Sequence, residues 1–305
     1  MTWKTIQVWL GRLAAVALLW WLGRSAVREW HAVAALHRTV EWRLLLVGAF
    51  FVGLALVQVS TAWGAVLRWL GGTVSFVQSF VIVNVSALGR YVPGKVWVLV
   101  GKIGFLQRLG VPSRLGVKSL LWEAGFASLT AGLWCVPGLG APHPLWAIGW
   151  ISVTGIGGLI GWGMWRTGAS GALHIIALVG RYVGLWILFG FGLFMVGQAV
   201  VPVPMRDLLP AIRAYALAHM ASVLVVWVPN GIGVREWCLH WLLEGTALQP
   251  VAGVVAFAMR GITTCLELTY AALGSAVCRR VMTPRPVGSH ATLTVVTEEV
   301  AATGS

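Results

Sequence analysis

Two long apolar stretches of this chain are each interrupted by proline, glycine and charged residues. The first break, residues 90–97, reads Arg-Tyr-Val-Pro-Gly-Lys-Val-Trp, and the second, residues 229–236, reads Pro-Asn-Gly-Ile-Gly-Val-Arg-Glu. An unpaired backbone N–H or C=O group is costly in hydrocarbon, so non-helical backbone at membrane depth must be buried in protein or line a wet cavity. Interrupted helices in both halves of a chain are the best sequence indication of a transport site.

The composition favours a polytopic α-helical membrane protein. Of the 305 residues, 58% are hydrophobic and only 10% are charged, and the mean hydropathy is +0.84. The net charge of +13 has two causes that can hold together: positively charged cytoplasmic helix ends, and attraction to anionic lipids. No long basic stretch interleaved with aromatic residues indicates nucleic-acid binding. The scattered cysteines contain no CxxC pair, so neither a disulfide framework nor a metal site is expected.

We predict an all-α fold with a single transmembrane domain over residues 1–280 and a disordered cytoplasmic tail over residues 281–305. About six full crossings are expected, at residues 8–22, 44–63, 119–136, 145–165, 174–200 and 251–277. The first is expected to be a retained helix rather than a cleaved signal peptide. Two re-entrant, broken-helix hairpins are expected at about residues 74–105 and 211–243, related as a pseudo-inverted repeat.

The charges of the links predict the orientation. Lys and Arg are frequent in residues 101–118 and absent from residues 137–144, so the former are expected in the cytoplasm and the latter outside. Both termini are then cytoplasmic, and the first hairpin enters from the cytoplasmic face and the second from the external face. The segment 24–43, with four Arg, does not fit this scheme; it can form an amphipathic helix on the membrane surface.

The first break has the chemistry of an anion site. A helix that restarts after Pro93 and Gly94 has unpaired N–H groups at its positive end. Arg90 and Lys95 flank that end and suit a phosphate. Two simpler roles stay open for these residues: the Pro-Gly pair only kinks a continuous helix, or the cations extend to the lipid headgroups. Lys102, two turns further, is expected near the cytoplasmic surface.

The second break follows the same logic. Asn230, Gly231 and Gly233 permit close approach of a ligand to the backbone. Arg235 is expected to bind an anionic headgroup or to pair with a carboxylate such as Glu123 or Glu267. Glu236 is favourable in the first helical turn.

His240 lies one turn after Glu236, but no third metal ligand is evident, so no metal and no cofactor are predicted. Glu123 and Glu267 lie inside apolar helices, where carboxylates are costly. Pairing with Arg235 or Arg260 and a role in proton or ion coupling are both open, and His240 is a third candidate coupling residue.

At these motifs the chain resembles the lysylphosphatidylglycerol synthase transmembrane region family of flippase-like membrane proteins. The resemblance depends on residues 84–95, on residues 228–236 with the Pro-Asn-Gly-Ile-Gly-Val-Arg-Glu string and on the link 105–110, within a match over residues 10–280. Asn230 departs from the family pattern, in which a second glycine is common there. The resemblance implies two facing re-entrant hairpins and movement of charged lipids between leaflets. Some members carry a soluble aminoacyl-transferring domain, which is not expected in this chain.

The sequence therefore predicts a flippase-like transporter of the bacterial inner membrane that moves an anionic or polyprenyl-phosphate-linked lipid, with a homo-oligomer possible. The headgroup is expected between the two breaks. The predicted substrate-binding residues are Arg90, Pro93, Gly94, Lys95, Asn230, Gly231, Gly233, Arg235 and Glu236. Two alternatives remain: a membrane enzyme acting on a lipid-linked phosphate or sugar, for which Glu236 and His240 are the nearest acid–base pair, and a non-transporting assembly partner.

Overall fold

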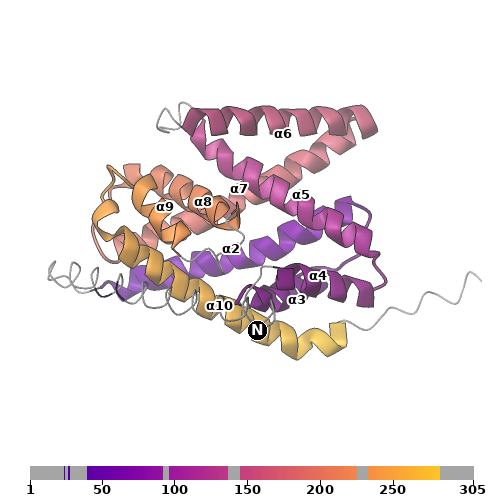
Figure 1. The fold of residues 1–305 in the computed structure, drawn as a ribbon, viewed down its shortest axis with the longest axis horizontal. Helices are drawn as coiled ribbons and strands as arrows, with labels where there is room; N and C mark the ends of the chain where they lie inside the picture. The colour runs from indigo at the N-terminus through magenta and orange to yellow at the C-terminus, as the bar shows by residue number, and fades with distance from the viewer. Residues whose placement is uncertain are drawn as a thin grey trace, which may run out of the picture.

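The computed structural model describes Arg24, Val27 and residues 40–91, 96–136, 145–224 and 233–281. Within these residues the protein is all-α and contains nine α-helices joined by short 3-10 turns (Figure 1). The helices are α2 (Trp42–Trp69), α3 (Phe76–Ala87), α4 (Val96–Arg108), α5 (Ser113–Gly132), α6 (Trp146–Thr167), α7 (Ala169–Gln198), α8 (Leu208–Leu224), α9 (Val234–Leu242) and α10 (Ala252–Val281). The predicted fold class is confirmed at this level.

Four of these helices are long and apolar enough to cross a membrane: α2, α6, α7 and the stretch Gln249–Val281 that contains α10. They coincide with four of the predicted crossings. The predicted crossing at 119–136 is helical, but its helix, α5, begins at Ser113 and carries charged residues that lower its hydropathy. The predicted first crossing, most of the segment 24–43 and the tail beyond Val281 lie outside the described residues.

Helices α2 and α7 form the central pair of the fold. They run antiparallel, since Gly48 faces Val196 and Gln58 donates a hydrogen bond to the carbonyl oxygen of Arg181. A Cβ atom on Gly48 would lie 2.7 Å from Val196 Cγ2 and 3.1 Å from the carbonyl oxygen of Gly192. Such close contact between backbones favours helix association where no water is present to drive it. The largest core cluster gathers around this pair.

Two antiparallel helix pairs flank the predicted breaks. In the pair α3–α4, Gly101 faces Ser86 and Gly89 contacts Trp97. In the pair α8–α9, Arg235 lies over the ring of Tyr215, and the Asp207 carboxylate, just before α8, accepts a hydrogen bond from the N–H of Ala247, beyond α9. We call these the first and the second hairpin.

The residues that join each hairpin, 92–95 and 225–232, lie outside the described residues. They include Pro93, Gly94, Lys95, Asn230 and Gly231. The backbone shape at the two breaks and the roles of these residues therefore stay predictions.

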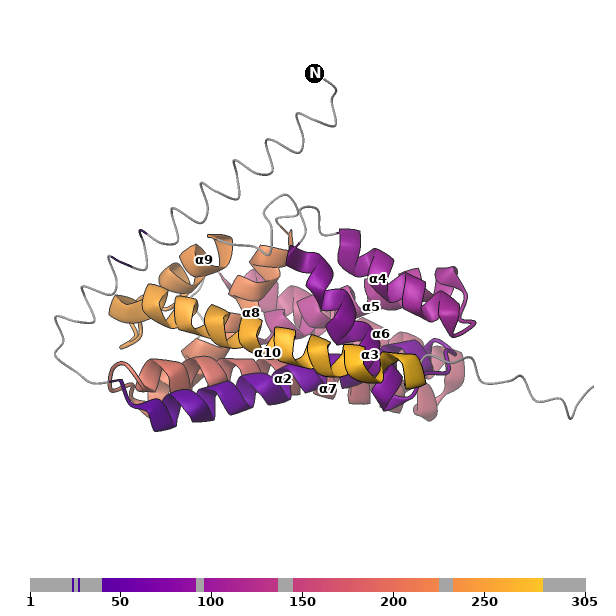
Figure 2. The same ribbon diagram turned by 90° about the horizontal axis from the view of Figure 1, so that it is seen from below.

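Helix α10 runs along both hairpins and places them on one framework (Figure 2). Its Arg260 donates to Glu236 of α9, and its Glu267 binds Arg90, which follows α3. Near its end, Tyr270 packs against Phe80 of α3, with ring centroids 5.4 Å apart. Residues far apart in the sequence are brought to one region by this single helix.

The two ends of the helical bundle differ in charge. Helices α2, α4, α6 and α10 end, and α5 begins, at the right of Figure 1. These helix ends carry Arg68, Arg108, Arg114, Lys118, Arg166, Arg279 and Arg280. No Asp or Glu among the described residues accompanies them, whereas Glu41, Asp207 and Glu244 lie at the opposite end with Arg43 and Arg206. We call the first the basic end; a cytoplasmic position for it is the one that the positive-inside rule favours.

Candidate functional site

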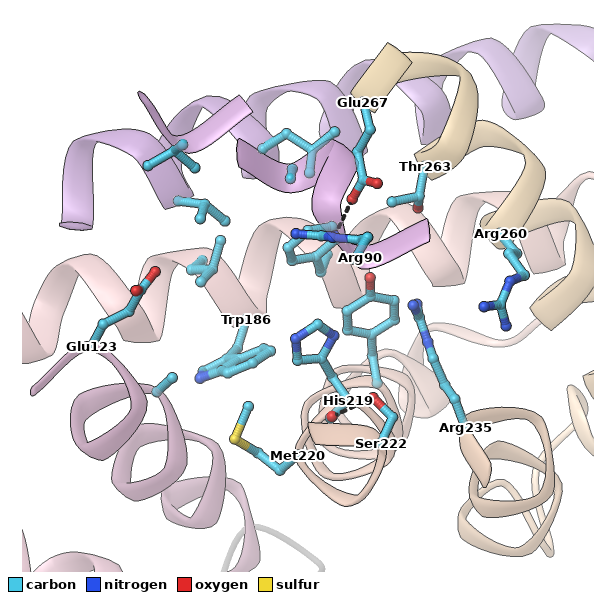
Figure 3. A pocket seen from close by; sticks show the side chains of 18 of the residues that line it. Arg90, Glu123, Trp186, His219, Met220, Ser222, Arg235, Arg260, Thr263 and Glu267 are labelled. Atoms are coloured by element: carbon cyan, nitrogen blue, oxygen red, sulfur yellow. Dashed lines mark hydrogen bonds and ion pairs between the residues drawn. The ribbon is translucent and has the colours of Figure 1, made fainter. Parts of the chain in front are cut away.

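A cavity of about 200 Å³ lies between the two hairpins, enclosed by α2, α5, α7 and α10. Four charged residues singled out from the sequence line it: Arg90, Glu123, Arg235 and Glu267. Arg260 and His219 also line it. Figure 3 shows Arg90 and Arg235 entering it from different helices, with Glu267 beside Arg90. Tertiary packing therefore brings the described cations of both breaks to one hollow.

Arg90 is paired with Glu267. The guanidinium contacts Oε1 of Glu267, while the Tyr91 hydroxyl donates a hydrogen bond of 2.8 Å to Oε2. The Glu267 side chain is only 4% exposed, against 32% for Arg90. A buried carboxylate requires such compensation. Of the two interpretations of Glu267, the structure shows structural pairing, but its partner is Arg90 rather than Arg235 or Arg260.

Lys102 and Glu123 form a second buried pair. The Lys102 ammonium lies 2.8 and 3.0 Å from the two carboxylate oxygens of Glu123. It also lies 5.0 Å from the ring centroid of Trp63. Lys102 is only 5% exposed, so its ammonium is compensated by Glu123 of α5 inside the protein. Its depth relative to the membrane surface stays a prediction.

Glu236 is held by two contacts at the start of α9. Its Oε1 accepts from Arg260 at 2.7 Å and its Oε2 accepts from the Gly233 N–H at 2.7 Å. Gly233 has a φ of 87°, which only glycine adopts readily. Because both oxygens serve these contacts, Glu236 acts as a helix cap and counter-charge. The acid–base pairing of Glu236 with the exposed His240 stays a prediction.

Arg235 has a different environment. Its Cζ atom lies 4.3 Å from the ring centroid of Tyr215, and Tyr215 is 1% exposed. No described carboxylate lies within ion-pair distance of it, and its buried Nη2 atom makes no hydrogen bond to the described residues. The expected pairing with Glu123 or Glu267 is absent from the described part of the chain, since Lys102 and Arg90 already occupy those carboxylates.

Aromatic residues that were not predicted from the sequence complete the walls. Tyr215, Tyr182 and Trp186 line the cavity. Trp186 donates to Thr130 at 3.0 Å, whereas the buried hydroxyl of Tyr182 makes no hydrogen bond to the described residues. The chain has only four Tyr, so a tyrosine within an apolar helix could have indicated a cavity-lining residue from the sequence.

A second hollow, of about 340 Å³, adjoins the cavity. The two share six lining residues: Arg90, Glu123, Ala127, His219, Met220 and Ser222. Its other walls, from α4, α5 and α8, are Val98, Leu99, Lys102, Leu120, Ala124, Ser128 and Val223. We call it the side slot. The charged cavity therefore continues into a passage between helices that has apolar side chains on its walls together with the Lys102–Glu123 pair.

Among the described residues, no three His, Cys, Asp or Glu side chains lie close enough to hold a metal ion. In comparisons with known proteins, no family model matches the chain and no curated protein matches it. Fold and site define an all-α protein with four helices long and apolar enough to cross a membrane, built around a charged cavity.

Proposed function

We propose that the chain is an integral protein of the bacterial inner membrane that moves an anionic or polyprenyl-phosphate-linked lipid between leaflets, as expected of the flippase-like family that its motifs resemble. One observation carries the proposal. Arg235 faces a cavity without a carboxylate partner among the described residues, and that cavity continues into the side slot, whose walls are partly apolar.

The charges around the cavity favour an anionic guest. Three carboxylates, Glu123, Glu236 and Glu267, are matched by Lys102, Arg260 and Arg90. Beside these three pairs, Arg235 is a fourth cation at the described part of the site. The described site therefore carries an excess of one positive charge when His219 is neutral. In surroundings of low dielectric constant an unpaired charge is costly, and a phosphate would compensate it. Guanidinium donors suit phosphate oxygens.

Arg235 is oriented for that role by Tyr215. Stacking over the buried ring restricts the guanidinium plane while leaving Nη2 as a donor for a ligand. Arg90 supplies a second contact on the other side, because a phosphate can share its partly exposed guanidinium with Glu267. If helix α4 begins at an open break, the amides after Gly94 and the ammonium of Lys95 add further donors.

The side slot gives a lipid chain a route out of the cavity. A lipid with its phosphate near Arg235 can place its hydrocarbon between Leu99, Leu120 and Val223. The chain then lies against these apolar side chains while the headgroup crosses, and Lys102 is neutralised by Glu123 on the same wall. A soluble anion would need no such slot, so the pair of hollows favours a lipid-linked phosphate.

The positions of the helix ends support two re-entrant hairpins. Gln78, near the start of α3, bonds to the carbonyl oxygen of Val281, and Arg108 ends α4, so the first hairpin leaves and returns to the basic end. The second hairpin begins after Asp207 and ends before Ala247, at the opposite end. Rocking of one hairpin against the other around the cavity would expose it to each leaflet in turn.

A scrambling assay with the purified protein in liposomes tests the proposal. Labelled phosphatidylglycerol and a labelled polyprenyl phosphate serve as substrates, and quenching from outside reports the fraction that has crossed. We expect Arg235→Gln to slow transport about tenfold or more, as expected for a lost charge-assisted contact, and Arg235→Lys to retain part of it. Arg206→Gln, at an exposed arginine of the opposite end, is the control.

Two outcomes contradict the proposal. One is transport by Arg235→Gln and Lys95→Ala at the wild-type rate; the other is no lipid movement by the wild-type protein above that of empty liposomes. The second would favour the assembly-partner alternative. Appearance of a chemically changed lipid during the assay would favour the enzyme.

A further inference from the structure

A separate hollow of about 530 Å³ lies at the basic end of the bundle, away from both hairpins. It is formed where α2 ends, α5 and α7 begin and α6 ends. Its lining is Trp69, Leu70, Leu115, Lys118, Trp122, Trp162, Gly163, Arg166, Thr167, Gly171 and Ile175. We call it the basic-end pocket; it shares no lining residue with the central cavity.

Three tryptophans form an aromatic wall in this pocket. The Trp69 ring lies edge-on to Trp122, with centroids 5.0 Å apart, and Trp122 stacks against Trp162 at 6.2 Å. Indole rings favour the boundary between the hydrocarbon and the headgroups. The neighbouring Trp165 is 83% exposed, which is consistent with a surface that meets lipid.

Two cations complete the pocket without a carboxylate. Lys118 and Arg166 are both exposed, and no ion pair joins either to a described residue. Arg166 is positioned by the ring of Trp162, 5.3 Å from its Cζ atom. The lining contains no Asp or Glu. The pocket is therefore electrostatically complementary to an anion.

We infer that the basic-end pocket binds the headgroup of an anionic glycerophospholipid, with its phosphate between Lys118 and Arg166 and its glycerol and upper acyl carbons along the tryptophan wall. Basic pockets between helices on the cytoplasmic side suit such lipids. The occupant is a resident lipid that bridges α5 and α6, and it is distinct from the transported one. The inference requires a membrane setting but does not require transport.

Native mass spectrometry of the full-length protein, titrated with phosphatidylglycerol or phosphatidylcholine, tests this site. We expect Lys118→Gln/Arg166→Gln to bind phosphatidylglycerol about 25-fold more weakly, since each basic residue near an anionic lipid contributes about a fivefold factor. Arg279→Gln/Arg280→Gln removes the same charge from the same end outside the pocket and is expected to keep wild-type binding. Arg235→Gln is also expected to keep it, which separates this site from the central cavity.

A second variant addresses the pocket without changing charge. Leu115→Trp fills the hollow and is expected to displace the most tightly bound phosphatidylglycerol while the protein remains monodisperse. Leu115→Trp also tests lipid binding in the basic-end pocket if the Lys118→Gln/Arg166→Gln variant does not fold.

Three results would overturn the inference. The first is that the Arg279→Gln/Arg280→Gln control weakens phosphatidylglycerol binding as much as the pocket variant does. The second is that folded Leu115→Trp binds the lipid as the wild type does. The third is that inorganic phosphate at matched concentration displaces the lipid. The last would identify a site for a free anion rather than for a lipid.

Discussion

The first hairpin brings Arg90 to the central cavity together with a counter-charge, whereas the second brings Arg235 over an aromatic ring. Glu267, 4% exposed, compensates Arg90, and the Tyr91 hydroxyl satisfies its remaining oxygen. Arg235 has Tyr215 and no described carboxylate. Both cations line one hollow, but among the residues that the structure describes only the first has a carboxylate partner.

This difference separates two uses of a buried charge. A paired charge holds helices together, and removal of one partner leaves the other uncompensated. A charge stacked on a ring is held in place at a lower energetic gain and keeps its capacity to bind an anion. The first hairpin is therefore expected to respond to substitution mainly in stability, and the second mainly in ligand binding.

The largest expected effect tests this comparison directly. Arg90→Met should lower the free energy of unfolding by about 3 kcal/mol, because it leaves the Glu267 carboxylate buried without its cation. Arg235→Met should change it by less than about 1 kcal/mol, because a cation–π contact is lost while apolar packing is gained. Denaturant titration in mixed micelles measures both. The double variant Arg90→Met/Glu267→Leu should recover most of the loss; equal destabilisation by the two single variants would remove the distinction.

A somewhat smaller effect is expected at the second ion pair of the first hairpin. Lys102→Met should destabilise by about 2 kcal/mol, since Glu123 loses its partner but is itself 21% exposed and can be partly hydrated. Arg114→Met, at an exposed cation of α5 without a described ion pair, is the control and should have almost no effect on the same titration. A similar loss in both variants would indicate that general charge, rather than burial, stabilises this region.

The smallest effect sharpens the description of the second hairpin. Glu236→Ala removes both the cap on Gly233 and the partner of Arg260 and should cost about 1–2 kcal/mol. Glu236→Gln retains an acceptor for the cap and should cost less. Hydrogen exchange of the amides in the first turn of α9 should rise in the alanine variant and change little in the glutamine variant. Equal exchange in both would show that the Gly233 contact does not stabilise the helix start.

Much of the helical framework was predictable because it depends on local sequence. The bounds of α2, α7 and α10 follow apolar runs whose lengths match a membrane crossing. The bounds of α5 were less well predicted, because its charges interrupt the hydropathy pattern even though its backbone is helical. The two hairpin regions were located from proline and glycine, and helices α3, α4, α8 and α9 lie within a few residues of the ranges expected.

The charge partners were not predictable in the same way. Glu267 and Arg90 are separated by 177 positions, and Glu123 and Lys102 by 21. From the sequence, Arg235 and Arg260 were equally suitable partners for either carboxylate. Which cation pairs with each carboxylate depends on which helix faces the packing brings together. Tyr215 and Tyr182 line the cavity for the same reason.

By itself, the sequence determined that the described chain is helical, that four helices can cross a membrane and that basic residues gather at particular helix ends, because backbone hydrogen bonding and hydropathy act over short distances along the chain. Only the tertiary structure decided which of the described cations has a carboxylate partner, because a buried charge is stabilised by whichever opposite charge the packing places within a few ångströms. Helix α10 contacts both hairpins: its Glu267 pairs with Arg90, and its Arg260 pairs with Glu236. Arg235 lies over the ring of Tyr215 instead.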